Sequence, residues 1–389
     1  MDTGKYKVID LFAGCGGSAL GFSKAGFSIS AAVDIDKIAT KTFQTNFPEA
    51  VAICSDIRDV KGKQLLKSAG IQNRDQFVLI ACPPCQGFSS ARRKSEAKSD
   101  PRNNLIYEFV RLVEETKPIV FVMENVPGLA KGIGKEVFNL TLKRLHSVGY
   151  RTVYDVADCA DYGIPQRRKR LVLIGTRNSE LRLTYPRKTN QDPNLKDAYL
   201  PAWKTVREAI SDLPKVKVGQ INPNDRLHKS ANLSETNLLR MINTPHNGGD
   251  RTSWPEDLKL KCHIKTNGFK DVYGRMRWDT PSPTMTGGCT MVSKGRYGHP
   301  EQNRAITLRE AARLQTFPDT FVFDGNFGDI AKQIGNAVPP LLAKRIADSL
   351  VESLYELGIS SKFINTKKTN LSSVLSSEKG SSQGSYQGF

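Results

Sequence analysis

Two cysteines stand three residues apart in the stretch ACPPCQGFSS, residues 81–90, which includes the end of an apolar run. A pair with this spacing can form a redox disulfide, supply two zinc ligands or frame one nucleophilic thiolate. Zinc would need two further ligands, but the five histidines are isolated and the sequence holds no second CxxC. A thioredoxin-like pair opens a helix, whereas the two prolines and the polar residues beyond them indicate a loop. We therefore interpret Cys85 as a candidate nucleophile and Cys82 as a buried, inert thiol.

A carboxylate and two arginines farther along the chain also stand at the ends of apolar runs. Glu124 follows the apolar run IVFVM, while Arg168 and Arg170 alternate at the entry to the run LVLIG. In isolation, Glu124 would be a helix cap or a solvated strand end, and the arginines would be phosphate contacts. The carboxyl ends of neighbouring parallel strands meet at one edge of a sheet, where ligands bind. We therefore expect Glu124 beside Cys85, as acid and nucleophile, and both arginine side chains on one side of their strand.

A glycine-rich loop occupies residues 10–22, DLFAGCGGSALGF, between an apolar run and a helical pattern. The spacing of Gly14, Gly16 and a following alanine fits a dinucleotide fingerprint, and Asp34 ends the next apolar run about twenty residues on, where an acid can bind ribose hydroxyls. Asp56 follows the third run and could hold an adenine amino group. A tight turn that only packs a helix on a sheet is the simpler alternative. These residues leave NAD and S-adenosylmethionine both open as cofactors.

The elements that must position these residues alternate along the first half of the chain. Strands are expected at residues 6–12, 28–33, 51–54, 77–81, 119–123, 152–156 and 171–174. Helical spacing of apolar residues occurs at 37–46, 102–116 and 134–148. Alternation of this kind predicts a doubly wound α/β sheet, and the continuous apolar runs are typical of buried parallel strands.

The alternation of strand and helix patterns stops after Gly175, which predicts that the chain is divided into domains. We expect a catalytic and cofactor-binding domain at 1–175 and a smaller, irregular domain at 176–300, which is rich in Asn, Lys, Pro and Thr. Helical patterning returns at 301–360, where the chain should rejoin the first domain. The Ser-, Gly- and Lys-rich residues 361–389 are expected to be a disordered tail.

The charge and composition of the chain indicate what kind of partner the protein binds and in which cellular compartment it works. The 389 residues carry a net charge of +18, with a sequence pI near 9.6, and the density of positive charge is highest in the middle segment. This balance favours a polyanionic partner, although a solvated basic face is the alternative. Seven irregularly spaced cysteines are not a secreted disulfide framework. With neither a signal-peptide pattern nor a membrane-length apolar stretch, a cytoplasmic protein without membrane contact is expected.

Six motifs, in this order, resemble those of the C5-cytosine DNA methyltransferases. They are PCQ at 84–86, ENVPG at 124–128, QRRKR at 166–170, RWDTPSPT at 277–284, LREAARLQTFPD at 308–319 and QIGNAVPP at 333–340. The resemblance covers roughly residues 6–175 and 277–350 and is specific, because several independent motifs would have to coincide. It implies a Rossmann-like, S-adenosylmethionine-dependent methyltransferase domain and, at 176–300, a target-recognition domain.

The resemblance assigns chemistry to the candidate residues. Cytosine C5 becomes nucleophilic when a thiolate adds to C6, so Cys85 would form a covalent adduct while Glu124 binds or protonates N3. Arg168 and Arg170 would face the cytosine and its loop, with Arg170 near the base O2. A stacked base is out of reach of such a site, which implies base flipping. Residues Gln86, Ser89, Arg92 and Arg93 would contact the DNA.

The same resemblance assigns the cofactor side, with S-adenosylmethionine as the cofactor and no metal. Asp34 would bind the ribose hydroxyls, Asp56 the adenine and Asn336 the methionine end. The other contacts expected from the resemblance are Phe12, Gly14, Gly16 and Ile35.

The biological setting implied is that of a bacterial or phage modification enzyme, a monomer that acts on a short sequence of double-stranded DNA. A cognate restriction endonuclease would recognise the same sequence. Two other activities stay open: an RNA (tRNA) cytosine-5 methyltransferase, which would keep every motif, and an NAD-dependent oxidoreductase, which rests on the glycine loop and Asp34 alone.

Overall fold

The computed structural model describes residues 6–72, 77–84, 104–197, 199–261 and 271–357. Several expectations fall outside these described residues. They concern the tail at 361–389 and the loop residues Cys85, Gln86, Ser89, Arg92 and Arg93.

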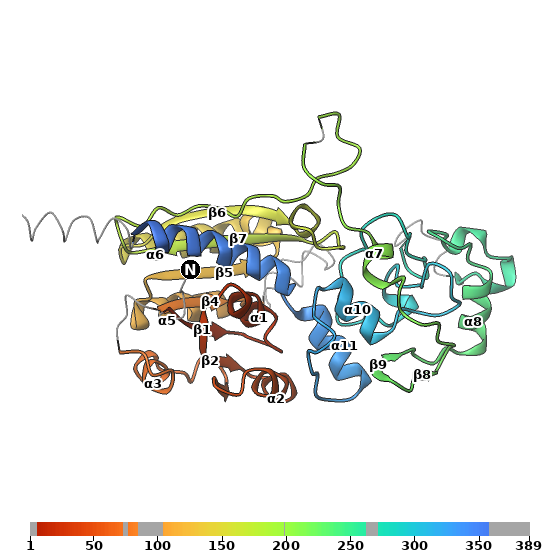
Figure 1. The fold of residues 1–389 in the computed structure, drawn as a ribbon, viewed down its shortest axis with the longest axis horizontal. Helices are drawn as coiled ribbons and strands as arrows, with labels where there is room; N and C mark the ends of the chain where they lie inside the picture. Colours follow the sequence, from red (N-terminus) through yellow and green to blue (C-terminus); the bar gives the residue numbers. More distant parts are fainter. Residues whose placement is uncertain (1–5, 73–76, 85–103, 198, 262–270, 358–389) are drawn as a thin grey trace, which may run out of the picture.

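A seven-stranded sheet forms the larger lobe (Figure 1), with the strand order β3-β2-β1-β4-β5-β7-β6. The strands are β1 Lys7–Leu11, β2 Ser28–Asp34, β3 Val51–Cys54, β4 Phe77–Ala81, β5 Val120–Asn125, β6 Arg151–Asp158 and β7 Lys169–Thr176. Each lies at one of the seven expected apolar runs, which confirms the doubly wound α/β fold. The interior strand β4 is buried at all five positions, as expected for a strand covered on both faces.

Helices cover both faces of the sheet because successive side chains of each strand point to opposite faces. Val8 belongs to one apolar cluster and Ile9 to another. The helices are α1 Gly17–Lys24, α2 Lys37–Asn46, α3 Gly62–Ser68, α5 Leu105–Thr116, α6 Lys135–Ser147 and a helix at residues 340–357. Side chains of α3, α5 and α6 cover the face of Ile9, and those of α1 and of 340–357 cover the face of Val8.

Strand β7 departs from the expected parallel arrangement, since it runs antiparallel to both β5 and β6. Only residues 159–168 connect β6 to β7, with a short 3-10 turn at Cys159–Tyr162, and a parallel crossover needs a dozen residues or more. The reversal brings the amino end of β7 to the edge of the sheet where β4 and β5 end. We call this side the carboxyl edge.

A second lobe, built from residues 205–337, stands beside the carboxyl edge (Figure 1). Its regular elements are few and short: α7 Val206–Ile210, β8 Ile221–Asn222, β9 Asp225–Lys229, α8 Glu235–Ile242, α10 Leu308–Leu314 and α11 Phe327–Asn336. Helix α10 contacts α7, β9 and α11. The expected boundaries at 175, 300 and 360 stay predictions. No helix in the described part of the chain is both long and apolar enough to cross a membrane.

Candidate active site

The ends of β4 and β5 meet at the carboxyl edge, as the sequence predicts for neighbouring parallel strands. The Asn125 side chain donates a 3.0 Å hydrogen bond from Nδ2 to the carbonyl oxygen of Pro83. Its Oδ1 accepts the backbone N–H of Val126 at 2.8 Å. This amide fixes the start of the segment that leads into Cys85, which itself lies beyond the described residues.

Glu124 and Arg170 form an ion pair across the β5–β7 contact, with Nε of Arg170 2.8 Å from Oε1 of Glu124. Their side chains are 11% and 14% exposed, so the pair is nearly buried yet open toward the edge. The contact lacks hydrogen-bond alignment, because Oε1 of Glu124 accepts no hydrogen bond from the described residues. This oxygen is itself buried, so Arg170 acts on it through charge rather than through an aligned bond.

Arg168 does not join this pair. Its side chain is buried and donates to three backbone carbonyls of the other lobe, Met285 at 2.8 Å and Gly335 and Ala337 at 3.2 Å each. Burial, and then the charge of Arg170, lowers the pKa of Arg168 to about 10, so the group is still cationic at neutral pH. Arg168 lies one residue before β7 begins, near enough to Arg170 and Glu124 for their charges to act on it. The structure thus shows Arg168 as a link between the lobes.

A buried polar group that the sequence analysis missed lies under the site. Asp10 is fully buried in β1, where Ser18 donates to its Oδ2 at 2.7 Å, while Oδ1 has no hydrogen-bond partner among the described residues. Burial raises the pKa of Asp10 to about 7. Cys82 is half-buried, and loss of solvent around its sulfur, and then the charge of Glu124, raises the pKa of its thiol well above its usual range, in keeping with an inert thiol. In the sequence, the only sign of this buried carboxyl group is an acidic residue inside the apolar run KVIDL.

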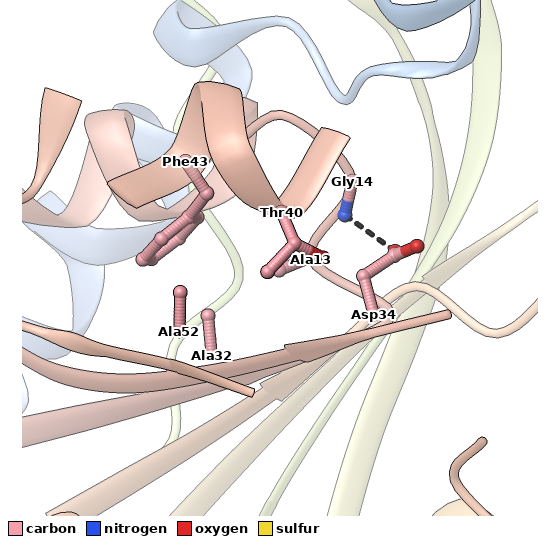
Figure 2. Close-up of a pocket in the computed structure, with 7 residues that line it drawn as sticks. All are labelled: Ala13, Gly14, Ala32, Asp34, Thr40, Phe43 and Ala52. Carbon is pink, nitrogen blue, oxygen red and sulfur yellow. Dashed lines mark hydrogen bonds between the residues drawn. The ribbon is translucent and has the colours of Figure 1, made fainter. Parts of the chain in front are cut away.

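The glycine loop is tied to the end of β2 by Asp34 (Figure 2). The backbone N–H of Gly14 donates to Oδ2 of Asp34 at 2.7 Å, and that of Asp36 donates to Oδ1 at 2.8 Å. Each oxygen keeps further acceptor capacity. Burial raises the pKa of Asp34. A small depression beside this pair is lined by Ala13, Gly14, Ala32, Asp34, Thr40, Phe43 and Ala52.

The two glycines of the loop have different roles. Gly14 has φ +54°, and a Cβ built there would meet nothing within 4 Å. The backbone of Gly14 therefore borders open space. Gly16 has φ +94° and precedes α1, where a Cβ would lie 2.7 Å from the ring of Phe47 and 2.9 Å from that of Phe43. Gly16 is therefore needed for packing against α2, and Gly14 leaves room for a ligand.

These residues fit S-adenosylmethionine as a cofactor. The open space at Gly14 and the free acceptor capacity of Asp34 suit a ribose, and Ile35 directly after it is 68% exposed, as a side chain that covers an adenine would be. Phe12 adopts φ +57° at the start of the loop. Asp56 is held by Arg58, whose Nε lies 2.9 Å from Oδ1, and these hydrogen bonds lower its pKa to about 2.

The carboxyl-terminal motif is brought to the same place. Lys332 of α11 forms an ion pair with Asp36 at 2.7 Å, and the Cys15 thiol lies 3.8 Å from the carbonyl oxygen of Gln333. Asn336 is the exposed last residue of α11. Within the described ranges, no group of three or more His, Cys, Asp or Glu could hold a metal ion.

Comparison with known proteins identifies the family to which the chain belongs. The family model of the C-5 cytosine-specific DNA methylases matches residues 6–352. The chain belongs to the C-5 cytosine-specific DNA methylase family. It is 38% identical over 358 residues to the type II methylase M.HgiDII of Herpetosiphon aurantiacus, covering 90% of this chain and 97% of that protein. It is also 38% identical over 346 residues to the type II methyltransferase M1.HphI of Haemophilus parahaemolyticus, with 88% and 86% covered.

Among solved structures, a DNA modification methyltransferase encoded within an Escherichia coli prophage superposes with a TM-score of 0.69 at 26% identity. The match covers 90% of this chain and 99% of that one. A methyltransferase from Entamoeba histolytica, at 17% identity and a TM-score of 0.60, shows the same fold. The protein is thus a DNA (cytosine-5) methyltransferase, and its family and fold imply S-adenosylmethionine rather than NAD.

Proposed function

We propose that this enzyme methylates C5 of a flipped-out cytosine in one short sequence of double-stranded DNA, through a covalent adduct on Cys85. The observation that carries the proposal is the Glu124–Arg170 pair, which stands at the end of β5 beside Pro83, two residues before Cys85. A nucleophile, an acid and a cation at one strand edge are what addition to a cytosine ring requires.

The proposed reaction proceeds in the following steps. The Cys85 thiolate adds to C6, and the electron density displaced onto the ring is received at N3 by a proton or hydrogen bond from Glu124. Arg170, whose Nε lies 2.8 Å from Oε1 of Glu124, would hold that carboxyl group through its charge and would contact the base O2. C5, now enamine-like, takes up a methyl group, which S-adenosylmethionine supplies as an electrophile. Water removes the C5 proton, and Cys85 is expelled as the ring becomes aromatic again.

The cofactor is proposed to lie across the amino-terminal strand ends. Asp34 would bind the ribose hydroxyls, and Ile35 would cover the adenine, whose amino group would share Asp56 with Arg58. Gly14, Gly16 and Phe12 would form the loop around it, with Gly16 acting through packing. Asn336 would contact the methionine end. The Arg168 links to the second lobe would hold this carboxyl-terminal segment in place.

The biological setting is proposed from the relatives, which are named type II methylases. A monomer would protect its sequence against a cognate restriction endonuclease, in the cytoplasm of a bacterial or phage-infected cell. The domain at 176–300 would read bases in the major groove while basic residues contact phosphates. The loop residues Gln86, Ser89, Arg92 and Arg93 would contact the DNA around the flipped base.

Transfer of labelled methyl groups from S-adenosylmethionine tests the proposal, with plasmid DNA and bulk tRNA as parallel acceptors and sequencing to locate the product. We expect label at cytosine C5 within one short DNA motif. Label in tRNA alone would make the protein an RNA methyltransferase and overturn the proposed substrate. The variant Cys85→Ala should lose transfer while still binding DNA, and Cys82→Ser should keep most of it.

A further inference from the structure

A cleft at the carboxyl edge plays no part in the proposed chemistry. It lies between the 3-10 turn Pro127–Ala130, the end of β6 and the start of β7, with a volume of about 420 Å³ that opens to solvent. Pro127 is three residues from Glu124, and Lys169 directly precedes Arg170 in β7, so the cleft lies at the same edge of the sheet as the proposed cytosine site, with Lys169 on the opposite face from Arg170.

One wall of the cleft is a cation stacked on an aromatic ring. The Arg167 guanidinium lies 4.2 Å from the centre of the Trp203 ring. Its Nε also lies 2.8 Å from Oδ2 of Asp158, and the indole N–H of Trp203 donates to Asp161 at 2.9 Å. Stacking together with two directed contacts fixes the wall rigidly.

Trp203 lies in the segment between β7 and α7, part of which forms a loop that projects away from both lobes (Figure 1). Backbone hydrogen bonds from Gln191 to Pro201 and from Trp203 to Gln191 close the loop at its base. Lys188 at the start of the loop forms an ion pair with Asp161 at 2.9 Å. The loop is therefore anchored to the sheet lobe through Asp161.

The charges that remain open in the cleft are positive. Asp158 is paired with Arg167, and Asp161 with Lys188. Lys131 and Lys169 are exposed, and neither has an ion pair with any residue of the described ranges. Two unpaired ammonium groups beside a rigid wall favour a phosphate backbone over a neutral ligand, because lysine binds phosphate as a point charge.

From this geometry we infer that the cleft binds the sugar-phosphate backbone of the DNA strand beside the target cytosine. Lys131 and Lys169 contact phosphates, and the stacked Arg167–Trp203 wall holds the strand in register as the base turns toward Glu124. This inference rests on the proposed DNA methyltransferase function and adds the surface that positions the strand.

The test compares two double variants of equal charge. Lys131→Ala/Lys169→Ala removes the cleft cations, and Lys67→Ala/Lys143→Ala removes two exposed lysines of α3 and α6, near the opposite edge of the sheet. Binding to a short, fluorescent, random-sequence duplex is measured over a series of NaCl concentrations. Each lost phosphate contact should lower the slope of log K against log salt by about 0.9. We expect the cleft variant to lose affinity and about two units of slope, and the control variant to lose neither.

A second arm locates the contact on the DNA. In a duplex that carries the methylated motif, single phosphates near the target cytosine are replaced by neutral methylphosphonates. The cleft variant should be insensitive to a replacement beside the cytosine that weakens the wild type. Equal losses in both double variants, or coupling only at distant phosphates, would overturn the inference while wild-type methylation stands. Failure of the wild type to bind or methylate DNA would instead refute the proposed function before any variant is compared.

Discussion

At the scale of single residues, the pair Glu124–Arg170 carries the chemistry, because it joins an acid and a cation that come from separate strands. Glu124→Gln keeps the shape of the side chain but cannot deliver a proton to N3, so methyl transfer should fall by about 10²- to 10⁴-fold. Single-turnover transfer to DNA measures this directly. Arg144, ion-paired with Glu114 at 2.6 Å on the exposed surface, offers a matched control. Arg144→Gln should leave transfer unchanged, and an equal loss there would point to a general effect of ion pairs on the fold.

Asp10 gives the fold a pH dependence at the residue scale. Its pKa is about 7 in the folded protein, against a usual value of 3.8, so the folded state holds a proton that the unfolded chain releases between these values. The resulting stabilisation is complete below pH 3.8 and is lost as the pH rises through about 7, by at most about 4 kcal/mol at about 1.4 kcal/mol per pH unit. Asp10→Asn should therefore gain stability relative to wild type between about pH 5 and pH 8. Urea unfolding at both values is the measurement, and a constant difference between the proteins would refute the raised pKa.

The glycines of the cofactor loop separate binding from packing. Gly16→Ala places a methyl group 2.7 Å from Phe47 at a positive φ, so thermal unfolding should reveal a large loss of stability. Gly14→Ala meets no atom within 4 Å and should cost only the backbone strain, about 1–2 kcal/mol. Calorimetric titration should show that Gly14→Ala weakens S-adenosylmethionine binding even so. Full affinity in this variant would mean that the cofactor does not approach Gly14.

At the scale of elements, two helices of the second lobe begin with the same capping box but in different surroundings. In α10, Thr307 is the N-cap, and Glu310 accepts its backbone N–H and forms a buried ion pair with Arg304 at 2.7 Å. Burial alone would raise the pKa of Glu310, but the bonds and charge of Arg304 outweigh it and lower the pKa to about 2. In α7, Thr205 is the N-cap, and Glu208 accepts its backbone N–H. Glu208 also forms an ion pair with Lys204, in an exposed position.

The two glutamates should therefore differ sharply on substitution. Glu310→Gln leaves a buried guanidinium without its counter-charge and should lower the free energy of unfolding by about 3–5 kcal/mol. Glu208→Gln should cost less than about 1 kcal/mol, because exposed pairs contribute little. Denaturant unfolding of both variants measures the difference. Similar losses would show that the capping box, and not the buried pair, stabilises α10.

Strands and helices could be predicted from the sequence where a local pattern of apolar residues determines them. The apolar runs around Val8, Val78 and Val120 indicate buried strands directly, and the structure has strands there. The antiparallel direction of β7 depends on the length of the connection from β6 and on the strands that lie beside it. A single apolar run in the sequence does not encode either of these. Arg168 and Arg170 lie close enough for the charge of one to act on the other, but the sequence did not indicate that Arg168 would bind carbonyls of the other lobe.

At the scale of the whole molecule, the site is assembled from distant parts of the chain. Arg168 of the sheet lobe binds carbonyls at 285, 335 and 337, and Lys332 reaches Asp36 beside the glycine loop. Motif order in the sequence predicted that the carboxyl-terminal segment returns to the site. The contacts that hold it could not be predicted, because buried arginines such as Arg168 are satisfied by backbone carbonyls, which carry no sequence signal.

The central claim, a Cys85 adduct on cytosine, is tested most directly by trapping that adduct. Duplex DNA containing 5-fluorocytosine in the methylated motif cannot lose a proton from C5 after methyl transfer, so the adduct cannot resolve. In the presence of S-adenosylmethionine, we predict a covalent protein–DNA complex whose cross-linked peptide, identified by mass spectrometry, contains Cys85. The complex should be absent in Cys85→Ser and unchanged in Cys82→Ser. Normal methylation of cytosine DNA without any trapped complex, or a cross-link at another residue, would contradict the proposed mechanism.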